Sequence, residues 1–162
     1  MEGMYMEQKK LKICFAASSG GHLEEISQLM ELLKYYDGFL ITEKDGLSKQ
    51  FFCSKVYFVR QTTRKEKLFL IYLFLIFLKD IILFLKEKPD CIISTGALTT
   101  FPACFLGKIM GKKVIYIESF ARVNSASLTG RLVYRFADMF LVQWKETLKF
   151  YPKAIYIQGG LF

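Results

Sequence analysis

The sequence predicts an α/β protein, with a parallel sheet wrapped by helices. Seven short apolar runs alternate along the chain with longer segments of helical spacing. Such alternation is typical of right-handed strand–helix–strand units. At 162 residues the chain has the size of one domain and is long enough to bury a core. We therefore expect a single domain over residues 1–162.

The candidate strands begin with the run KICFAA. In chain order they are residues 12–17, 39–42, 56–59, 91–94, 114–118, 139–143 and 154–158. Between the first two runs, apolar residues recur at intervals of three and four, which predicts one face of a helix; they are Leu23, Ile26, Met30 and Leu33. Pro102 stands near the first turn of the helix expected after residues 91–94.

The loops that follow the predicted strands form the candidate site. In a parallel sheet all of these loops emerge at the same edge, and ligands bind there. Five loops carry polar or charged residues and are expected to meet: residues 18–22, 43–45, 60–64, 95–97 and 118–122.

The composition narrows the class of partner. About half of the residues are apolar, which excludes a disordered chain and suggests that some apolar surface stays uncovered. The formal charge of +8 favours an anionic partner, which could be nucleic acid, a phosphorylated substrate or an acidic membrane surface. We expect no nucleic acid, because no recognisable module is present and the aromatic residues are concentrated in apolar segments.

The cysteines and the N-terminus indicate a cytosolic protein. Cys14, Cys53, Cys91 and Cys104 lie far apart and form no CxxC pair, so they are interpreted as reduced core thiols. The first ten residues, MEGMYMEQKK, contain no apolar stretch of the kind that an export signal needs.

Residues 68–85, LFLIYLFLIFLKDIILFL, are the most apolar part of the chain. The uninterrupted apolar run ends before Lys79 and Asp80, which makes it too short for a spanning helix of about 20 apolar residues. Basic residues flank the segment on both sides and would favour an anionic leaflet. We therefore expect a helix that lies in the membrane interface. The alternative is a buried crossover helix between two strands.

Two glycine-containing turns precede predicted helices. In the first, Ser18, Ser19, Gly20 and Gly21 would let bare backbone N–H groups approach an anion. The second turn, in STGALTTFP, contains Thr95 and Gly96. Two such turns at one edge favour a diphosphate, although glycines of this kind also serve close packing in ordinary strand-to-helix corners. Neither GxGxxG nor GxxxxGK occurs, and we expect no cofactor and no metal ion.

Two titratable residues at this edge are candidates for catalysis. His22, the sole histidine, could act as a general base, or it could cap the helix or donate a hydrogen bond to substrate. Glu118 ends an apolar run and could orient a sugar hydroxyl. Its alternative role is a salt bridge to Arg122 or a neighbouring lysine.

The stretches SSGGHLEEI, STGALTTFP and VIYIESFARV, in this order and spacing, resemble a known family. From about Lys12 to Gly160 the chain is similar to the Alg14-type half of a split inverting glycosyltransferase, as in capsule and exopolysaccharide enzymes of the PssD and CpsF type. These resemble the Rossmann-like N-terminal half of MurG-like GT-B enzymes.

The resemblance implies a division of labour between two chains. This half would bind a polyprenyl-diphosphate sugar at the cytoplasmic face of the cell membrane, as a peripheral or monotopic protein. A separate Alg13-like or PssE-like chain would bind the UDP-sugar donor. The last residues given, AIYIQGGLF, correspond to the place where a two-domain GT-B enzyme would cross into its donor domain. The loop 18–22 with Thr95 and Gly96 would hold the diphosphate, Arg60 and Arg64 would neutralise it, and Glu118 would match the acidic residue after the fifth strand.

The leading hypothesis is therefore inverting transfer of a sugar from a UDP-sugar to a lipid-linked acceptor in polysaccharide biosynthesis, in which His22 and Glu118 are the catalytic candidates. The alternative is a non-catalytic membrane anchor and activator of the partner transferase. A self-contained oxidoreductase is disfavoured because the dinucleotide fingerprint is missing.

Overall fold

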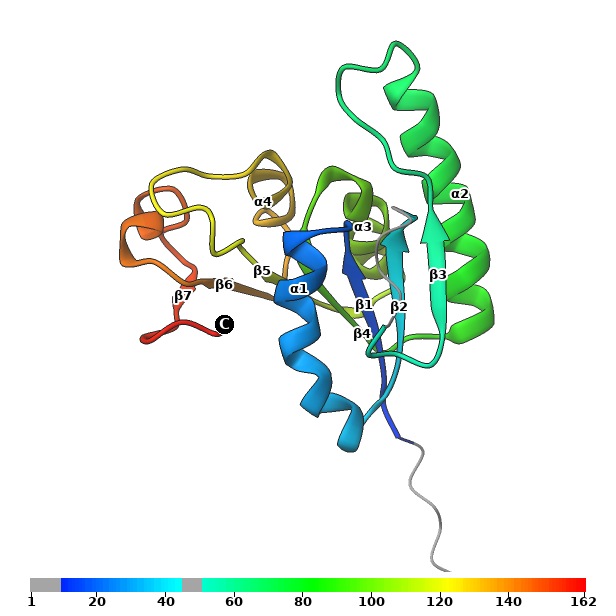
Figure 1. Cartoon of the computed structure of the whole chain (residues 1–162), viewed down its shortest axis with the longest axis horizontal. Helices are drawn as coiled ribbons and strands as arrows, with labels where there is room; N and C mark the ends of the chain where they lie inside the picture. The colour runs from blue at the N-terminus through cyan, green and yellow to red at the C-terminus, as the bar shows by residue number, and fades with distance from the viewer. Residues whose placement is uncertain (1–9, 45–50) are drawn as a thin grey trace, which may run out of the picture.

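The computed structural model describes residues 10–44 and 51–162 (Figure 1). Asp45, at the end of one predicted site loop, and residues 1–9 lie outside the described residues. Seven strands pair in parallel as one sheet, in the order β3-β2-β1-β4-β5-β6-β7. Their bounds are β1 Lys12–Ala17, β2 Asp37–Glu43, β3 Val56–Val59, β4 Cys91–Gly96, β5 Lys113–Ile117, β6 Met139–Val142 and β7 Ile155–Tyr156. Each predicted strand is confirmed within two residues at either end.

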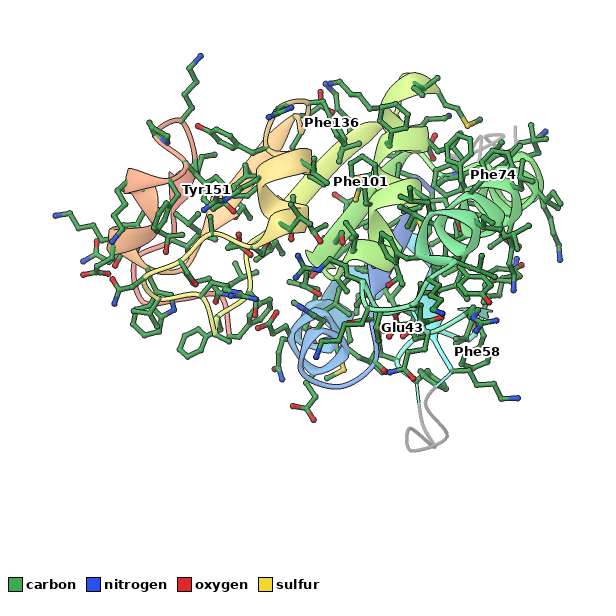
Figure 2. All side chains as sticks on the ribbon, turned by 90° about the horizontal axis from the view of Figure 1, so that it is seen from above. Glu43, Phe58, Phe74, Phe101, Phe136 and Tyr151 are labelled. Atoms are coloured by element: carbon green, nitrogen blue, oxygen red, sulfur yellow. The ribbon has the colours of Figure 1, made fainter. Side chains whose placement is uncertain are left out.

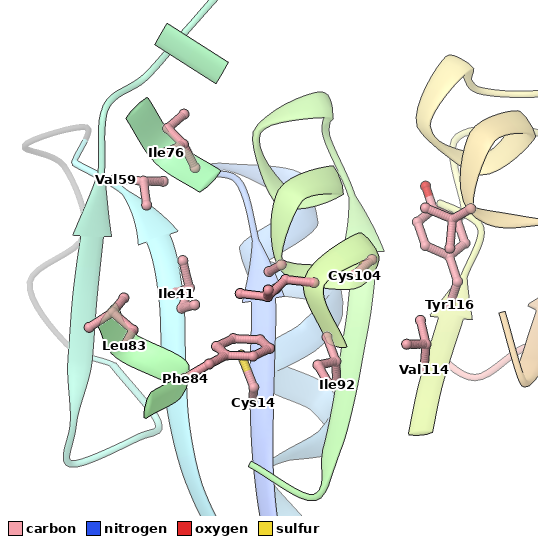
Figure 3. Packing of buried hydrophobic residues seen from close by; sticks show 14 of the residues in the cluster. Cys14, Ile41, Val59, Ile76, Leu83, Phe84, Ile92, Cys104, Val114 and Tyr116 are labelled. Carbon is pink, nitrogen blue, oxygen red and sulfur yellow. The ribbon is translucent and has the colours of Figure 1, made fainter. Parts of the chain in front are cut away.

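Helices cover both faces of the sheet, so the predicted α/β class is confirmed. On one face α2 (Phe69–Glu87), α3 (Phe101–Ile109) and α4 (Leu128–Val133) enclose the larger core cluster. Figure 3 shows this cluster, in which Cys14 and Ile41 of the strands meet Leu83 and Phe84 of α2. α1 (Gly21–Ser27) and the 3₁₀-helix η1 (Gln28–Lys34) cover the other face.

Strand β1 supplies both cores because successive side chains point to opposite faces of a sheet. Cys14 and Ala16 belong to the cluster under α2 and α3. Ile13, Phe15 and Ala17 belong to the cluster under α1. All five are buried, as expected for a strand near the centre of a parallel sheet.

The helix after β1 differs from the prediction at one residue. Met30 was expected on the buried face, but it is exposed. The chain changes from α-helix to 3₁₀-helix at Gln28. A 3₁₀-helix has three residues per turn, so the stripe that faces the core continues from Ile26 through the half-buried Leu29 and Leu32 instead.

The cysteines lie largely inside the fold, as predicted. All four are free thiols, and Cys14, Cys53 and Cys104 are buried. Burial raises the pKa of the Cys53 thiol to about 12, which keeps it in the unreactive protonated form.

Helix α2 matches the alternative of a crossover helix for residues 68–85, although only one of its faces is buried, and a place in the membrane interface stays a prediction. It is the crossover between β3 and β4, and it packs Ile76, Leu83 and Phe84 against the sheet. Its opposite face is apolar and exposed along the whole helix, through Leu70, Ile71, Phe74, Leu75, Leu78, Ile82 and Leu85. Among the helices in the described part of the chain, none has the length and apolar content needed to cross a bilayer.

Asp80 lies on the sheet-facing side of α2, where it is completely buried. Within the described residues, neither of its carboxylate oxygens has a hydrogen-bond partner. Burial raises the pKa of Asp80 to about 8, and the neighbouring Lys79 offsets only part of that effect. The carboxyl group therefore keeps its proton near neutral pH, which avoids an unpaired charge in the core.

We predict that the protein is more stable at pH 5 than at pH 8. An unfolded Asp releases its proton near its ordinary pKa of 3.8, whereas the folded one keeps it up to about 8. Between these values the folded state binds more protons, so the free energy of unfolding falls by about 1.4 kcal/mol per pH unit. The measurement is the urea midpoint at both pH values.

Asp80→Asn is the control, because it keeps the size of the side chain but cannot ionise. The variant also retains the sole histidine, so the difference between the two proteins isolates Asp80. The prediction is wrong if wild type and Asp80→Asn show the same change between pH 5 and pH 8.

Candidate functional site

The candidate site lies where the strand order reverses. From β1 the chain proceeds to β2 and β3 on one side, and α2 then returns it to β4 on the other side of β1. Loops after β1 and β4 therefore diverge at the carboxyl edge, and such a switch point is the usual ligand site of an open α/β sheet. The β1 loop carries residues 18–22, and β4 ends at Gly96.

His22 and Gly96 meet closely at this point. A Cβ added to Gly96 would lie 2.9 Å from His22 Cε1 and 3.0 Å from the Tyr116 hydroxyl. Gly96 also has φ +124°, a conformation that other residues rarely adopt. The Thr95 hydroxyl donates a hydrogen bond to the His22 carbonyl oxygen at 2.8 Å. The two predicted turns are thus joined, and Gly96 gives the imidazole its place against β4.

Glu25, one turn after His22, connects α1 with the loop after β5. Its Oε2 lies 3.5 Å from His22 Nδ1. Its Oε1 accepts hydrogen bonds from the Ser119 hydroxyl at 2.8 Å and the Phe120 N–H at 2.9 Å. Burial alone would raise the pKa of Glu25, but the neighbouring His22 and the hydrogen bonds from Ser119 and Phe120 outweigh it and hold the pKa below its ordinary value. Glu25 is therefore ionised at neutral pH.

A pocket of about 620 Å³ opens at this edge of the sheet. It is lined by hydroxyl, basic and small residues: His22, Thr62, Thr63, Arg64, Ala97, Leu98, Ser119, Ala121, Arg122, Ser127, Leu128 and Thr129. These residues come from the loops after β1, β3, β4 and β5 and from the start of α4. Four of the five predicted loops thus contribute to one cavity with two guanidinium groups in its wall.

The predicted phosphate-binding residues are not all at this pocket. Arg64 lines it, but Arg60 stacks on the Tyr72 ring, 3.7 Å from its centroid, and pairs with Glu66 at 3.5 Å. Arg60 is thereby committed to the start of α2.

The turn of Ser18, Ser19, Gly20 and Gly21 lies beside the pocket without lining it. Open space surrounds both glycines, which agrees with an accessible turn. The Ser19 hydroxyl, however, points to a carboxylate oxygen of Glu43 at 3.5 Å. Glu43, labelled in Figure 2, is buried, and it places a second acceptor group next to the turn. Binding of phosphate by this turn stays a prediction.

Glu118 is buried behind the pocket wall. Its Oε2 accepts from the Ser127 N–H at 3.2 Å, the Ser127 hydroxyl at 3.0 Å and the Tyr151 hydroxyl. Its Oε1 accepts from the Ser119 N–H at 3.2 Å. No salt bridge to Arg122 forms; the carboxylate instead braces Ser119 and Ser127, which do line the pocket. A catalytic role for Glu118 stays a prediction.

Sequence reasoning did not single out Glu25, Arg122 or Ser127 as binding residues. Glu25 lies three positions after His22, a spacing that places two side chains on the same helix face. The sequence could therefore have predicted that Glu25 lies beside His22. Ser127 and Glu118 are brought together by the fold of the loop between β5 and α4. The Ser127 hydroxyl also caps α4, where it accepts a hydrogen bond from the Gly130 N–H at 2.8 Å.

We predict that Gly96→Ala displaces His22. The added methyl group meets the imidazole, and an alanine at this position would have an unfavourable backbone φ. We therefore expect a loss of about 3 kcal/mol in the free energy of unfolding. Gly111→Ala is the matched control: φ is +69° there, but open space surrounds the site, and a loss of about 1 kcal/mol is expected. Urea unfolding and the NMR resonances of the sole histidine measure both effects. Equal losses with an unmoved histidine resonance would contradict the prediction.

Comparison with known proteins finds one matching family model and several relatives that carry the same description. The family model described as "Oligosaccharide biosynthesis protein Alg14 like" matches residues 13–161. UDP-N-acetylglucosamine transferase subunit alg14 of Schizosaccharomyces pombe is 46% identical over 74 residues, which cover 43% of this chain and 35% of the relative. The Mus musculus protein of the same description is 28% identical over 184 aligned positions, covering 93% of this chain and 83% of the relative.

Solved structures show the same fold. MurG of Acinetobacter baumannii superposes with a TM-score of 0.67 at 15% identity, over 85% of this chain and 42% of that chain. A UDP-N-acetylglucosamine 2-epimerase superposes with a TM-score of 0.70 at 16% identity, over 87% of this chain and 44% of that chain. The sheet described above therefore corresponds to somewhat less than half of each of these larger chains.

Proposed function

Because the chain belongs to the Alg14 family, we propose that it is the acceptor-binding subunit of a two-chain glycosyltransferase. The curated relatives are called UDP-N-acetylglucosamine transferase subunits, so the proposed donor is a UDP-sugar of this type. The proposed partner is an Alg13-like or PssE-like chain that binds the donor. The proposed acceptor is a polyprenyl-diphosphate sugar.

The observation that carries this proposal is the pocket at the switch point. It combines a histidine with Arg64 and Arg122, which suit a diphosphate, and with the hydroxyl groups of Ser119, Ser127 and Thr129, which suit a sugar. Arg64 also lies just before α2 begins at Phe69, so the exposed apolar face of α2 starts near the same edge. The pocket could thus bind the polar headgroup of the acceptor, and the adjacent face of α2 could contact its lipid tail.

The proposed reaction is an inverting displacement. The acceptor hydroxyl oxygen attacks the anomeric carbon of the donor sugar, the bond from that carbon to UDP breaks, and UDP leaves with the electron pair. His22 takes the hydroxyl proton as the general base. Arg64 and Arg122 bind the diphosphate of the acceptor, and Glu118 holds the pocket wall through Ser119 and Ser127.

We predict that His22→Ala lowers transfer about 100-fold or more in the reconstituted pair, because a positioned general base contributes at least that factor. The assay follows transfer from a UDP-sugar to a polyprenyl-diphosphate sugar, and a pull-down confirms that the pair still forms. Met30→Ala, at an exposed position of η1, is the control and should be fully active.

Full activity of His22→Ala would exclude the catalytic assignment. Weak activity of the partner alone, enhanced equally by wild type and His22→Ala, would instead support a non-catalytic anchor and activator. The matched variant Glu118→Gln tests the second candidate in the same assay.

We further propose that the exposed face of α2 binds the membrane surface. Phe74, labelled in Figure 2, is 58% exposed, and Leu70 is 74% exposed. Both side chains help to line an apolar groove between α2 and α3, together with Leu73, Phe77, Phe101, Pro102 and Phe105. Exposed basic residues at both ends of the helix would contribute about 1 kcal/mol each near an anionic leaflet; they are Arg64, Lys65, Lys67, Lys86 and Lys88.

We predict that a variant with Leu70, Phe74 and Leu78 all changed to Ser no longer sediments with anionic vesicles, whereas wild type does. These side chains are exposed, so their replacement removes apolar contact with lipid and leaves the core intact. The control replaces Met30 and Tyr35 by Ser, which are comparably exposed on η1 and beside it. Equal sedimentation of both variants would contradict a membrane role for α2.

A further inference from the structure

We propose that Glu25 is a positioning residue that holds His22 in the Nδ1–H tautomer and so leaves Nε2 free to accept a proton in the pocket. This inference rests on the function proposed above, because it concerns the state of the proposed base. It adds a residue from the same helix to the site.

The geometry leaves one arrangement for the imidazole. His22 Nδ1 and Glu25 Oε2 are both buried, they face each other at 3.5 Å, and neither makes a hydrogen bond within the described residues. Cε1, between the two nitrogens of the ring, is the atom pressed toward Gly96. The ring itself is 29% exposed and lines the pocket, so Nε2 is the nitrogen left to meet a substrate.

The distance of 3.5 Å is longer than a usual hydrogen bond. Hydrogen bonds of catalytic groups are often long before substrate binds and shorten in the complex. A carboxylate can only accept, so a hydrogen bond between these atoms requires a proton on Nδ1. The hydrogen bond that one nitrogen makes therefore decides which nitrogen is protonated.

Glu25 is itself held in place from the far side. The Ser119 hydroxyl and the Phe120 N–H both bind Oε1, which leaves Oε2 for His22. These donors come from the loop after β5, about a hundred residues further along the chain. Other charged groups near the imidazole are Arg64 and Arg122, which line the same pocket from the loops after β3 and β5. Within the described residues Glu25 is the carboxylate that pairs with the ring.

The chain is suited to a direct test because it contains a single histidine. In the full chain labelled with ¹⁵N-histidine, long-range ¹H–¹⁵N spectra distinguish the two neutral tautomers without any activity assay. At a pH where the ring is neutral, we expect the Nδ1–H form in wild type. Glu25→Gln keeps the size of the side chain but removes the carboxylate, and it should shift the population toward Nε2–H.

Glu24→Gln is the matched control, since Glu24 is adjacent, carries the same charge and is exposed. It should leave the tautomer and the activity unchanged. Should Glu25→Gln fail to fold, Ser119→Ala removes one of the bonds to Oε1 and should give the same shift in weaker form.

Activity supplies the second readout. In the reconstituted pair we expect Glu25→Gln to lower kcat about 10-fold or more while the KM for the UDP-sugar stays unchanged, with partial rescue by Glu25→Asp. An Nε2–H tautomer in wild type would overturn the inference even if the pair is fully active. An Nδ1–H tautomer that Glu25→Gln abolishes would support the assignment of Glu25, and a failure of every pair to transfer sugar would then count against the proposed function alone.

Discussion

The parallel pairing of β1 with β4 is the constraint on which the rest of the structure depends. It sets the end of β4 beside the loop that leads from β1 into α1. The backbone of Gly96 and the ring of His22 can then share a space in which a methyl group would not fit. The hydrogen bond from Thr95 to the His22 carbonyl fixes the same contact from the backbone side.

The fold could be predicted from the sequence because its signals are local. Seven apolar runs of strand length are sufficient to define a parallel sheet once helical spacing separates them. Met30 was misplaced since the choice between α-helix and 3₁₀-helix depends on how the turn packs under β1, which periodicity alone does not contain. The exposed and sheet-facing sides of α2 could not be separated either, because both are apolar.

The pocket at the carboxyl edge could be predicted in outline, but the contacts of its side chains only in part. The rule that loops gather at the carboxyl edge brought together four of the five loops at one pocket. The directions of individual side chains were harder to predict from the sequence, because they depend on tertiary partners. Arg60 turns away to Tyr72 and Glu66, and Glu118 turns inward to Ser127 and Tyr151. Glu25 is held by Ser119 and Phe120, which are remote in sequence.

Asp80 has a consequence before the protein has folded. During synthesis the segment Leu68–Leu85 is the stretch that an insertion machinery would test as a transmembrane helix. Lys79 and Asp80 lie together within it, and each charged group at the centre of a nascent helix opposes insertion by about 3 kcal/mol. The same carboxyl group that is neutral in the finished core is charged in the nascent chain. Its charge opposes insertion of this apolar segment into the bilayer, and its neutral form in the finished fold allows the segment to pack on the sheet.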